Sequence, residues 1–413
     1  MSQPLLLTQQ HRYRRVVVPV SEAEAVDAVM LLPESSWMRS YVIHATRQTT
    51  APLVYHVGVG LAVLGTTCPI PYGMHYAGAL RANNFVLCVG RSGEDRKSTA
   101  LNIGKDLLDQ AASGLIGDYP GSAEGLIESL AEQESQFIPI SEFGKFLSSG
   151  QRGYFEPIKT LLADAWDCHP QQRAKAARQG ARVVIRADNP RLSIGAACSI
   201  PYLEKHTLAE DWTGGFMGRW LVLYGRRERT DPNPIGDSRL TETLVDGLRL
   251  RANMPTAGWC TGLTPDAGAY WNNWYHEISA RKLPGNIVGI RARAPTMARK
   301  IALVLGWDYG PAQAGQPWKM GMDLMEPAIA ITELHIKSLM HLSEVIAEHA
   351  DARMRRSVID SIDAKGGTAT FGEILGRLKM RKRPVQESLE ALLEEGKVKR
   401  LNTSLGFAYE LQS

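Results

Sequence analysis

The sequence predicts a mixed α/β protein, and two observations support this class. Residues 84–225 contain short apolar runs that alternate with helical patterns, as expected for strands of a largely parallel sheet joined by helices. One of these runs leads through a glycine-containing turn, residues 90–96, into a helical pattern. The predicted strands lie at residues 85–89, 137–140, 183–186, 192–197 and 220–224. Flanking helical regions and a separate C-terminal module complete the predicted architecture.

Composition is that of a soluble globular protein. The chain has 413 residues, of which 44% are hydrophobic and 22% charged, and this length allows two or three domains. A net charge of +4 permits local basic surfaces but does not by itself indicate a nucleic-acid partner. The five cysteines show no paired spacing, and no charged segment followed by a long apolar core begins the chain. We therefore expect reduced thiols and a cytoplasmic protein.

Residues 1–83 are predicted to form a helical region in front of the sheet. Ser21, followed by Glu24 three positions later, predicts a capping box at a helix start. The apolar residues 54–71 are interrupted by His56, three glycines and two threonines. This segment therefore predicts a buried helix, with no contact to a membrane.

The turn after the first predicted strand has the context of a phosphate-binding loop. In such loops glycines let backbone N–H groups surround a polyphosphate, a lysine reaches the outer phosphates, and a hydroxyl reaches magnesium. Lys97 and Ser98 suit the last two roles and predict ATP with Mg2+ as the ligand. The residues expected to contact the nucleotide are Gly90, Ser92, Gly93, Arg96, Lys97, Ser98 and Thr99.

The loop also departs from the common form of this motif. That form has glycines six residues and one residue before the lysine, where this chain has Arg91 and Arg96. An ordinary strand-to-helix connection is therefore the alternative interpretation. Arg96 adds a charge that can itself contact a phosphate.

A second chemical site is predicted 45 residues after the lysine, where an apolar run ends at Ser141 and Glu142. An acid at a strand end is where ATPases of this kind keep the carboxylate that polarises the attacking water. We expect Glu142 to be that base, with Ser141 holding Mg2+ through its hydroxyl or a water. The alternative is a strand-end glutamate that caps the next turn. Ser199, at the polar end of a later strand, is placed to sense the terminal phosphate.

Two arginines are candidates for completing the site of a neighbouring subunit. Arg219 follows a glycine-rich turn and precedes an apolar strand, so the turn can direct its side chain at a neighbour's nucleotide. Arg293 lies just before Pro295 and offers a second source of positive charge. Pairing with a nearby acid is the alternative for Arg219. Three further arginines compete for the role, at positions 226, 227 and 229.

Basic residues predict contacts with DNA in two places. A turn at residues 179–181 projects Lys175, Arg178 and Arg182, which suits a single-strand phosphate backbone, although a solvated charged face is the alternative. Residues 350–413 predict three short helices and a two-stranded ribbon, the order of a winged helix-turn-helix. The groove-contacting residues would be Arg381, Lys382, Arg383 and Gln386. Acidic residues along the third helix, such as Glu387 and Glu390, leave a protein-binding winged helix as the alternative.

Together these features resemble a family of P-loop ATPases found beside primases in phages and mobile elements, often called primase-associated or helicase-like. The resemblance covers about residues 40–345 and depends on the order of the loop, the Glu142 segment and the Arg219 turn. It implies a RecA-like ATPase core, ring assembly, a replication role and a primase as a possible partner. The order of core, helical region and winged helix is also similar to ring helicases of the minichromosome-maintenance type, which leaves RecA-like and AAA+ cores open.

The leading hypothesis is an ATP-dependent DNA motor, a hexameric replicative helicase of a phage or mobile element. The second is a replication initiator or helicase loader in which ATP acts as an assembly switch with slow or no hydrolysis. The third is a winged-helix transcription regulator with a vestigial ATPase domain. The expected regions are an N-terminal helical region, a P-loop NTPase core, a helical region that completes it, and the winged helix: residues 1–83, 84–230, 231–349 and 350–413.

Overall fold

The chain divides into two compact units, Met1–Leu342 and Ser343–Ser413, and the division falls within helix α13 (Met322–Asp363). The expected boundary between residues 349 and 350 lies in the same helix. The first unit contains the first two expected regions and most of the third, residues 231–342. The computed structural model describes residues 20–69, 72–76, 78–149, 156–176, 182–207, 209–213, 215–231, 233–403 and 406–412.

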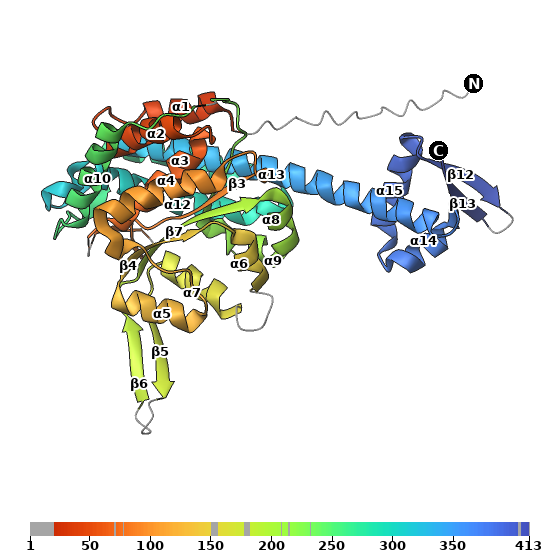
Figure 1. Cartoon of the computed structure of the whole chain (residues 1–413), viewed down its shortest axis with the longest axis horizontal. Helices are drawn as coiled ribbons and strands as arrows, with labels where there is room; N and C mark the ends of the chain where they lie inside the picture. The colour runs from red at the N-terminus through yellow and green to blue at the C-terminus, as the bar shows by residue number, and fades with distance from the viewer. Residues whose placement is uncertain are drawn as a thin grey trace. The chain divides into compact units, whose positions relative to one another are not determined.

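A four-stranded parallel sheet forms the centre of the first unit (Figure 1). Its strand order is β4-β7-β3-β8, so the first strand in the chain lies between the last two. Nearly every residue of these strands is buried, which explains why they are continuous apolar runs rather than alternating patterns. The strands are β3 (Phe85–Gly90), β4 (Ser135–Ile140), β7 (Arg191–Ser199) and β8 (Trp220–Tyr224). The predicted α/β class with a parallel sheet is confirmed.

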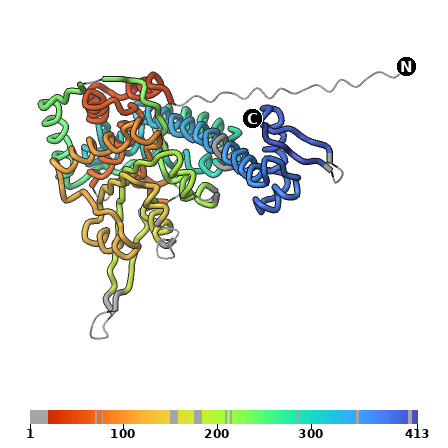
Figure 2. Tube along the Cα trace, turned by 45° about the vertical axis from the view of Figure 1, so that its right-hand side comes forward, coloured from red at the N-terminus to blue at the C-terminus, as the bar shows by residue number. Residues whose placement is uncertain are grey.

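Residues 183–186 were predicted to be a strand of the largely parallel sheet, and this prediction was wrong. This run forms β6 (Arg182–Ala187), which pairs antiparallel with β5 (Gln171–Ala176) rather than joining the parallel sheet. The two strands form a hairpin that extends away from the rest of the unit in both views (Figures 1 and 2). Val184 is 56% exposed there, as expected for an antiparallel ribbon with one solvated face.

One face of the sheet is covered by two helices that lie side by side, α3 (Leu53–Thr66) and α4 (Lys97–Ala112). Every residue of α3 is buried, which confirms the prediction of a buried helix. Gly58 shows why its residues are small: a Cβ atom there would lie 2.5 Å from a methyl carbon of Leu223 and 2.6 Å from one of Val86. These glycines let the helix approach the strands closely.

The opposite face packs against aromatic side chains. Val86 points to α3, so the neighbouring Phe85 must point to the other side of the sheet. There its ring lies 5.2 Å from that of Trp220, which in turn lies 4.6 Å from Phe143 at the start of α6 (Phe143–Ser149). The sheet is therefore the middle of three layers.

A second, smaller sheet joins three distant parts of the chain. Its order is β10-β9-β1-β2, and each strand has only two to four residues. Buried residues such as Met74 and Cys260 alternate with exposed ones such as His75 and Thr261, so one face packs inward and the other meets solvent. The strands are β1 (Met74–His75), β2 (Ala79–Leu80), β9 (Cys260–Leu263) and β10 (Trp318–Met320).

Helices complete the first unit. Ser21 and Glu24 form the predicted capping box before α1, because the hydroxyl accepts from the N–H of Glu24 and the carboxylate accepts from the N–H of Ser21. Among the described residues, none of the helices combines the length and apolar character needed to cross a membrane. The remaining helices are α1 (Glu22–Met30), α2 (Trp37–Gln48), α5 (Ala123–Glu132), α7 (Glu156–Trp166), α8 (Ile200–His206), α9 (Ala209–Thr213), α10 (Ser238–Ala252), α11 (Pro265–Ala280) and α12 (Val288–Asp308).

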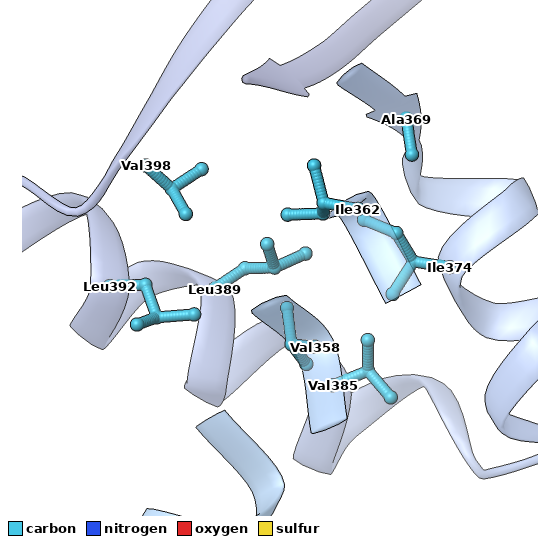
Figure 3. Close-up of a cluster of buried hydrophobic side chains, with 8 residues drawn as sticks. All are labelled: Val358, Ile362, Ala369, Ile374, Val385, Leu389, Leu392 and Val398. Carbon is cyan, nitrogen blue, oxygen red and sulfur yellow. The ribbon is translucent and has the colours of Figure 1, made fainter. Parts of the chain in front are cut away.

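The second unit has its own small hydrophobic core, drawn in Figure 3. Its elements after α13 are β11 (Thr368–Thr370), α14 (Phe371–Leu378), α15 (Lys382–Glu394), β12 (Val398–Thr403) and β13 (Gly406–Leu411). Thr370 caps α14 together with Glu373. Val358 and Ile362 from α13 meet Leu389 of α15 in this core, so the unit buries apolar residues from three helices and the ribbon.

Candidate functional site

A cavity of about 510 Å³ opens at the carboxyl ends of β3, β4 and β7. Ligands of parallel α/β sheets bind at this edge, because the loops that leave neighbouring strands meet there. The lining brings together Lys97 and Ser98 with Ser141 and Glu142, which are far apart in the sequence. Ser199 at the end of β7 also lines it. The other predicted nucleotide contacts in the lining are Ser92, Gly93, Arg96 and Thr99.

The loop between β3 and α4 is closely packed at its start. A Cβ atom on Gly90 would lie 2.4 Å from the hydroxyl of Tyr55 and 2.8 Å from Oδ2 of Asp95, so only glycine fits there. Gly90 does not itself line the cavity in the described structure; it allows the turn that forms the cavity wall. Tyr55 fixes this end of β3 by donating to the carbonyl oxygens of Val89 at 2.6 Å and Gly225 at 2.9 Å.

Arg96 occupies a backbone conformation that suits glycine. Its φ is 49° and its ψ is 31°, in the left-handed region, and it is the N-cap of α4. A non-glycine residue in this region costs about 1–2 kcal/mol. The chain therefore departs from the common loop in the side chain at this position, while the backbone keeps the conformation that glycine would adopt freely.

Asp95 holds the loop in shape, and sequence reasoning missed it. Its side chain is fully buried and accepts from the backbone N–H of Arg91 at 2.6 Å and of Arg227 at 3.2 Å. The Arg91 guanidinium adds an ion pair at 3.1 Å. Burial alone raises the pKa of this carboxyl, but the hydrogen bonds from Arg91 and Arg227 outweigh it, so the pKa is lowered. Asp95 thus ties the loop to the segment that follows β8.

Lys97 lies on the first turn of α4 with its ammonium at the cavity. Nζ donates to the carbonyl oxygen of Arg91 at 2.7 Å, across the loop. Burial lowers the pKa of Lys97, and Asp95 opposes this. The amides of the first helical turn, at residues 97–99, have no acceptor within the helix, so they and the helix dipole favour an anion at this point.

Glu142 and Ser141 follow β4 and line the opposite side of the same cavity. The carboxylate of Glu142 forms an ion pair with Lys145 one helical turn later, and both side chains are mostly exposed. Glu142 pairing raises the pKa of Lys145. Lys145 was not predicted, although its spacing of three residues from Glu142 at a helix start is a signal for such a pair.

The cavity offers oxygen ligands that suit Mg2+. The hydroxyls of Ser98 and Ser141 and the carboxylate of Glu142 all line it. Mg2+ is usually bound by one or two carboxylates together with substrate phosphates and water, so this set fits the ion when a nucleotide is present. In the described part of the chain, no group of three or more histidine, cysteine, aspartate or glutamate residues is placed to hold a metal by itself.

Comparison with known proteins assigns the chain to no family, because no protein-family model matches it and no curated protein is significantly similar to it. The predicted resemblance to primase-associated ATPases therefore stays a prediction. The function of this protein is therefore inferred from the geometry of the cavity.

Arg219 and Arg293 lie away from this cavity. Arg219 immediately precedes β8, so it is at the amino end of a parallel strand, the opposite edge of the sheet. Its guanidinium donates to Asp167 at 2.8 Å and to the carbonyl of Gly215 at 3.0 Å. Arg293 is beside it, 6.0 Å from the ring of Trp166. Within one chain, Arg219 thus pairs with an acid, which is the alternative interpretation of this residue given above.

The predicted DNA-contacting residues fall in two places. Lys175 and Arg182 lie on β5 and β6 near the tip of the hairpin, and Arg178 lies outside the described residues. Arg381, Lys382, Arg383 and Gln386 lie together at the start of α15. Two of these four already bind acids of the same helix: Arg383 contacts Glu387 at 2.8 Å and Gln386 contacts Glu390 at 3.0 Å.

Proposed function

We propose that this protein is an ATP-dependent DNA motor with a P-loop NTPase core, a ring-forming replicative helicase of a phage or mobile element. The single observation that carries the proposal is the cavity shared by Lys97, Ser98 and Glu142 at the carboxyl edge of a parallel sheet. A lysine and a hydroxyl on the first turn of a helix, facing a carboxylate, are the groups that phosphoryl transfer to water requires. ATP and Mg2+ are the expected ligands.

The strand order supports this assignment of roles. β7 lies between the loop strand β3 and the acid-bearing strand β4. Adjacent strands are about 4.8 Å apart, so the ends of β3 and β4 are separated by roughly 10 Å. This separation leaves room for a terminal phosphate and an attacking water between Lys97 and Glu142. Both RecA-like and AAA+ cores remain compatible with the proposal.

Within the cavity each residue would have a distinct task. The amides of residues 97–99 and the ammonium of Lys97 would hold the phosphates, and Lys97 would exchange its bond to the Arg91 carbonyl for one to a charged phosphate oxygen. Ser98 and Ser141 would hold Mg2+, which neutralises charge on the phosphates when bound. Glu142 would orient water and accept its proton once it separates from Lys145.

The proposed assembly is a homo-oligomeric ring, with a hexamer favoured. Arg219 and Arg293 lie at the sheet edge opposite the cavity of their own chain, so in such a ring they would act on the nucleotide of another subunit. The β5–β6 hairpin would track a single strand through Lys175, Arg178 and Arg182. The second unit, read as a winged helix, would contact duplex DNA through the start of α15. A primase is a possible partner, and the proposed compartment is cytoplasmic.

The decisive experiment compares Lys97→Ala with a matched control on the same helix. Lys105 is also on α4, but it is partly exposed and pairs with Asp106 and Asp109. We expect Lys97→Ala to abolish ATP hydrolysis and unwinding of a forked duplex, and Lys105→Ala to retain both. Unwinding that survives the loss of Lys97 would rule out the motor.

One observation favours a second function: the Lys97 ammonium and the Glu142 carboxylate both bind other groups of the chain. Lys97 is bonded to the Arg91 carbonyl and Glu142 is paired with Lys145. If these contacts persist with ATP bound, hydrolysis would be slow and the nucleotide would act as an assembly switch, as in a replication initiator or helicase loader. ATP-dependent oligomerisation with negligible DNA-stimulated turnover would select this alternative over the motor.

A further inference from the structure

Arginine and aromatic side chains meet at the small sheet, far in sequence from the phosphate loop. Trp259, next to β9, contacts two other side chains. The Arg81 guanidinium is 5.0 Å from the centre of its ring, and the His75 ring is 5.1 Å from it. His75 is exposed, whereas Trp259 and Arg81 are partly accessible to solvent.

A second arginine, Arg299 of α12, lies between two aromatic rings beneath this surface. Its guanidinium is 4.1 Å from the ring centre of Tyr76 and 4.2 Å from that of Trp271. Arg299 is 8% exposed. Cation–π contacts of this kind are worth about 0.5–2 kcal/mol each, more when the cation is desolvated. The two ring contacts hold the Arg299 guanidinium in a fixed position.

Asp167 offsets part of the positive charge of Lys300, whereas Arg81 and Arg299 have no acidic partner among the described residues. The Arg81 guanidinium donates instead to the carbonyl oxygen of Tyr72 at 3.3 Å, and that of Arg299 contacts two aromatic rings. Lys300, fully buried, donates to the carbonyl oxygens of Arg81, Asn83 and Trp166. Burial lowers the pKa of Lys300 to about 8. Buried cations are normally paired, so this excess favours an anionic ligand at the accessible end of the cluster.

A purely structural role accounts for only part of this arrangement. The stack of Tyr76, Arg299 and Trp271 joins the small sheet to α11 and α12, and its burial needs no ligand. Arg81 and Trp259 differ because they remain accessible, one offering charge and the other a ring surface. Such an alternation of aromatic and basic groups is how proteins bind single strands without reading their sequence.

We propose that the face formed by His75, Arg81 and Trp259 binds single-stranded nucleic acid. A base stacks on the Trp259 indole, and Arg81, whose backbone carbonyl accepts a hydrogen bond from Lys300, contacts a neighbouring phosphate. Duplex DNA hides its base surfaces in the stack, so the face selects a single strand. The inference shares the nucleic-acid partner of the proposed function, but it requires neither ATP binding nor hydrolysis.

The test measures binding of the full chain to a fluorescein-labelled oligothymidine of about 20 nucleotides, long enough to exceed a typical site. No nucleotide is added, and a duplex of equal length is compared. Trp259→Leu is expected to weaken binding about 5- to 100-fold, the worth of one stacked base. Arg81→Gln is expected to weaken it and to reduce the slope of log affinity against log salt by about one. The control Arg249→Gln alters an exposed arginine paired with Asp246 and should leave affinity unchanged.

The outcomes separate this inference from the proposed function. Thermal unfolding of each variant first establishes that it is folded. If the wild type binds the strand and both folded variants bind it as tightly, the inference is overturned while the motor stands. Binding of the duplex but not the strand also overturns it. If the wild type binds neither, both the inference and the DNA partner of the proposed function fail.

Discussion

Acid should destabilise the first unit through His56, which lies in the middle of α3. The imidazole is fully buried, and neither ring nitrogen has a hydrogen-bond partner among the described residues. Burial, reinforced by the positive charges of Arg229 and His44, lowers its pKa from 6.5 to about 3. The unfolded chain therefore binds a proton at this site from about pH 6.5 downward, and the folded protein does not.

The sign and size of the effect follow from proton linkage. Stability from His56 is fully present above pH 6.5 and decreases as the pH falls toward 3, because the unfolded state binds more protons in this range. Each pH unit corresponds to about 1.4 kcal/mol once the pH is well below 6.5, so a change from pH 7 to 4.5 removes roughly 2–3 kcal/mol. Replacing the imidazole by a hydrocarbon removes this titration while other groups still titrate.

The assay is urea unfolding followed by tryptophan fluorescence at pH 7 and at pH 4.5. We expect His56→Leu to lose roughly 2–3 kcal/mol less than the wild type between these pH values. His276→Leu removes an exposed imidazole of α11 and should show the wild-type dependence. Equal losses for the wild type and His56→Leu would refute the reasoning and indicate that water or another group satisfies the buried ring.

Three further predictions concern the cavity. Arg96→Gly should leave the free energy of unfolding unchanged or raise it by up to about 1 kcal/mol, because relief of the left-handed strain is partly offset by a more flexible unfolded chain. Urea unfolding measures this free energy, and a clear loss of stability would mean that the Arg96 side chain makes a stabilising contact. Asp95→Ala should lower the free energy of unfolding by about 1–3 kcal/mol, because the amides of Arg91 and Arg227 lose their buried acceptor; thermal unfolding without a shift would contradict this. Glu142→Gln should reduce ATP turnover about 100-fold or more while a fluorescent ATP analogue still binds, and unchanged turnover would remove Glu142 from the proposed chemistry.

Local sequence signals predicted much of the fold. The buried character of α3, the capping residue Ser21, and the strands β3 and β8 follow from patterns within a few residues. The partner of the run at residues 183–186 did not follow, because an apolar run indicates a strand but not which strand it pairs with. The hairpin is decided by the short connection to residues 171–176, whose polar sequence gave no strand signal.

The candidate site was predictable where one rule of parallel sheets applies. Lys97 and Glu142 each follow an apolar run, and the carboxyl ends of parallel strands meet at one edge, so their convergence was expected. Asp95 and Asp167 could not be identified in this way. Asp95 contacts Arg227, 132 positions later, and Asp167 contacts Arg219, 52 positions later. Pairs so far apart in the sequence depend on the final packing of the chain.

The β5–β6 hairpin affects how readily copies of this protein aggregate at high concentration. A two-stranded ribbon leaves a row of backbone N–H and C=O groups along each outer side, and such rows promote aggregation by recruiting strands from other molecules. The sequence gives both strands basic residues, at positions 173, 175, 182 and 186, and charged residues on edge strands are one way in which proteins oppose such pairing. Neutral variants made to study the hairpin should therefore be checked for precipitation.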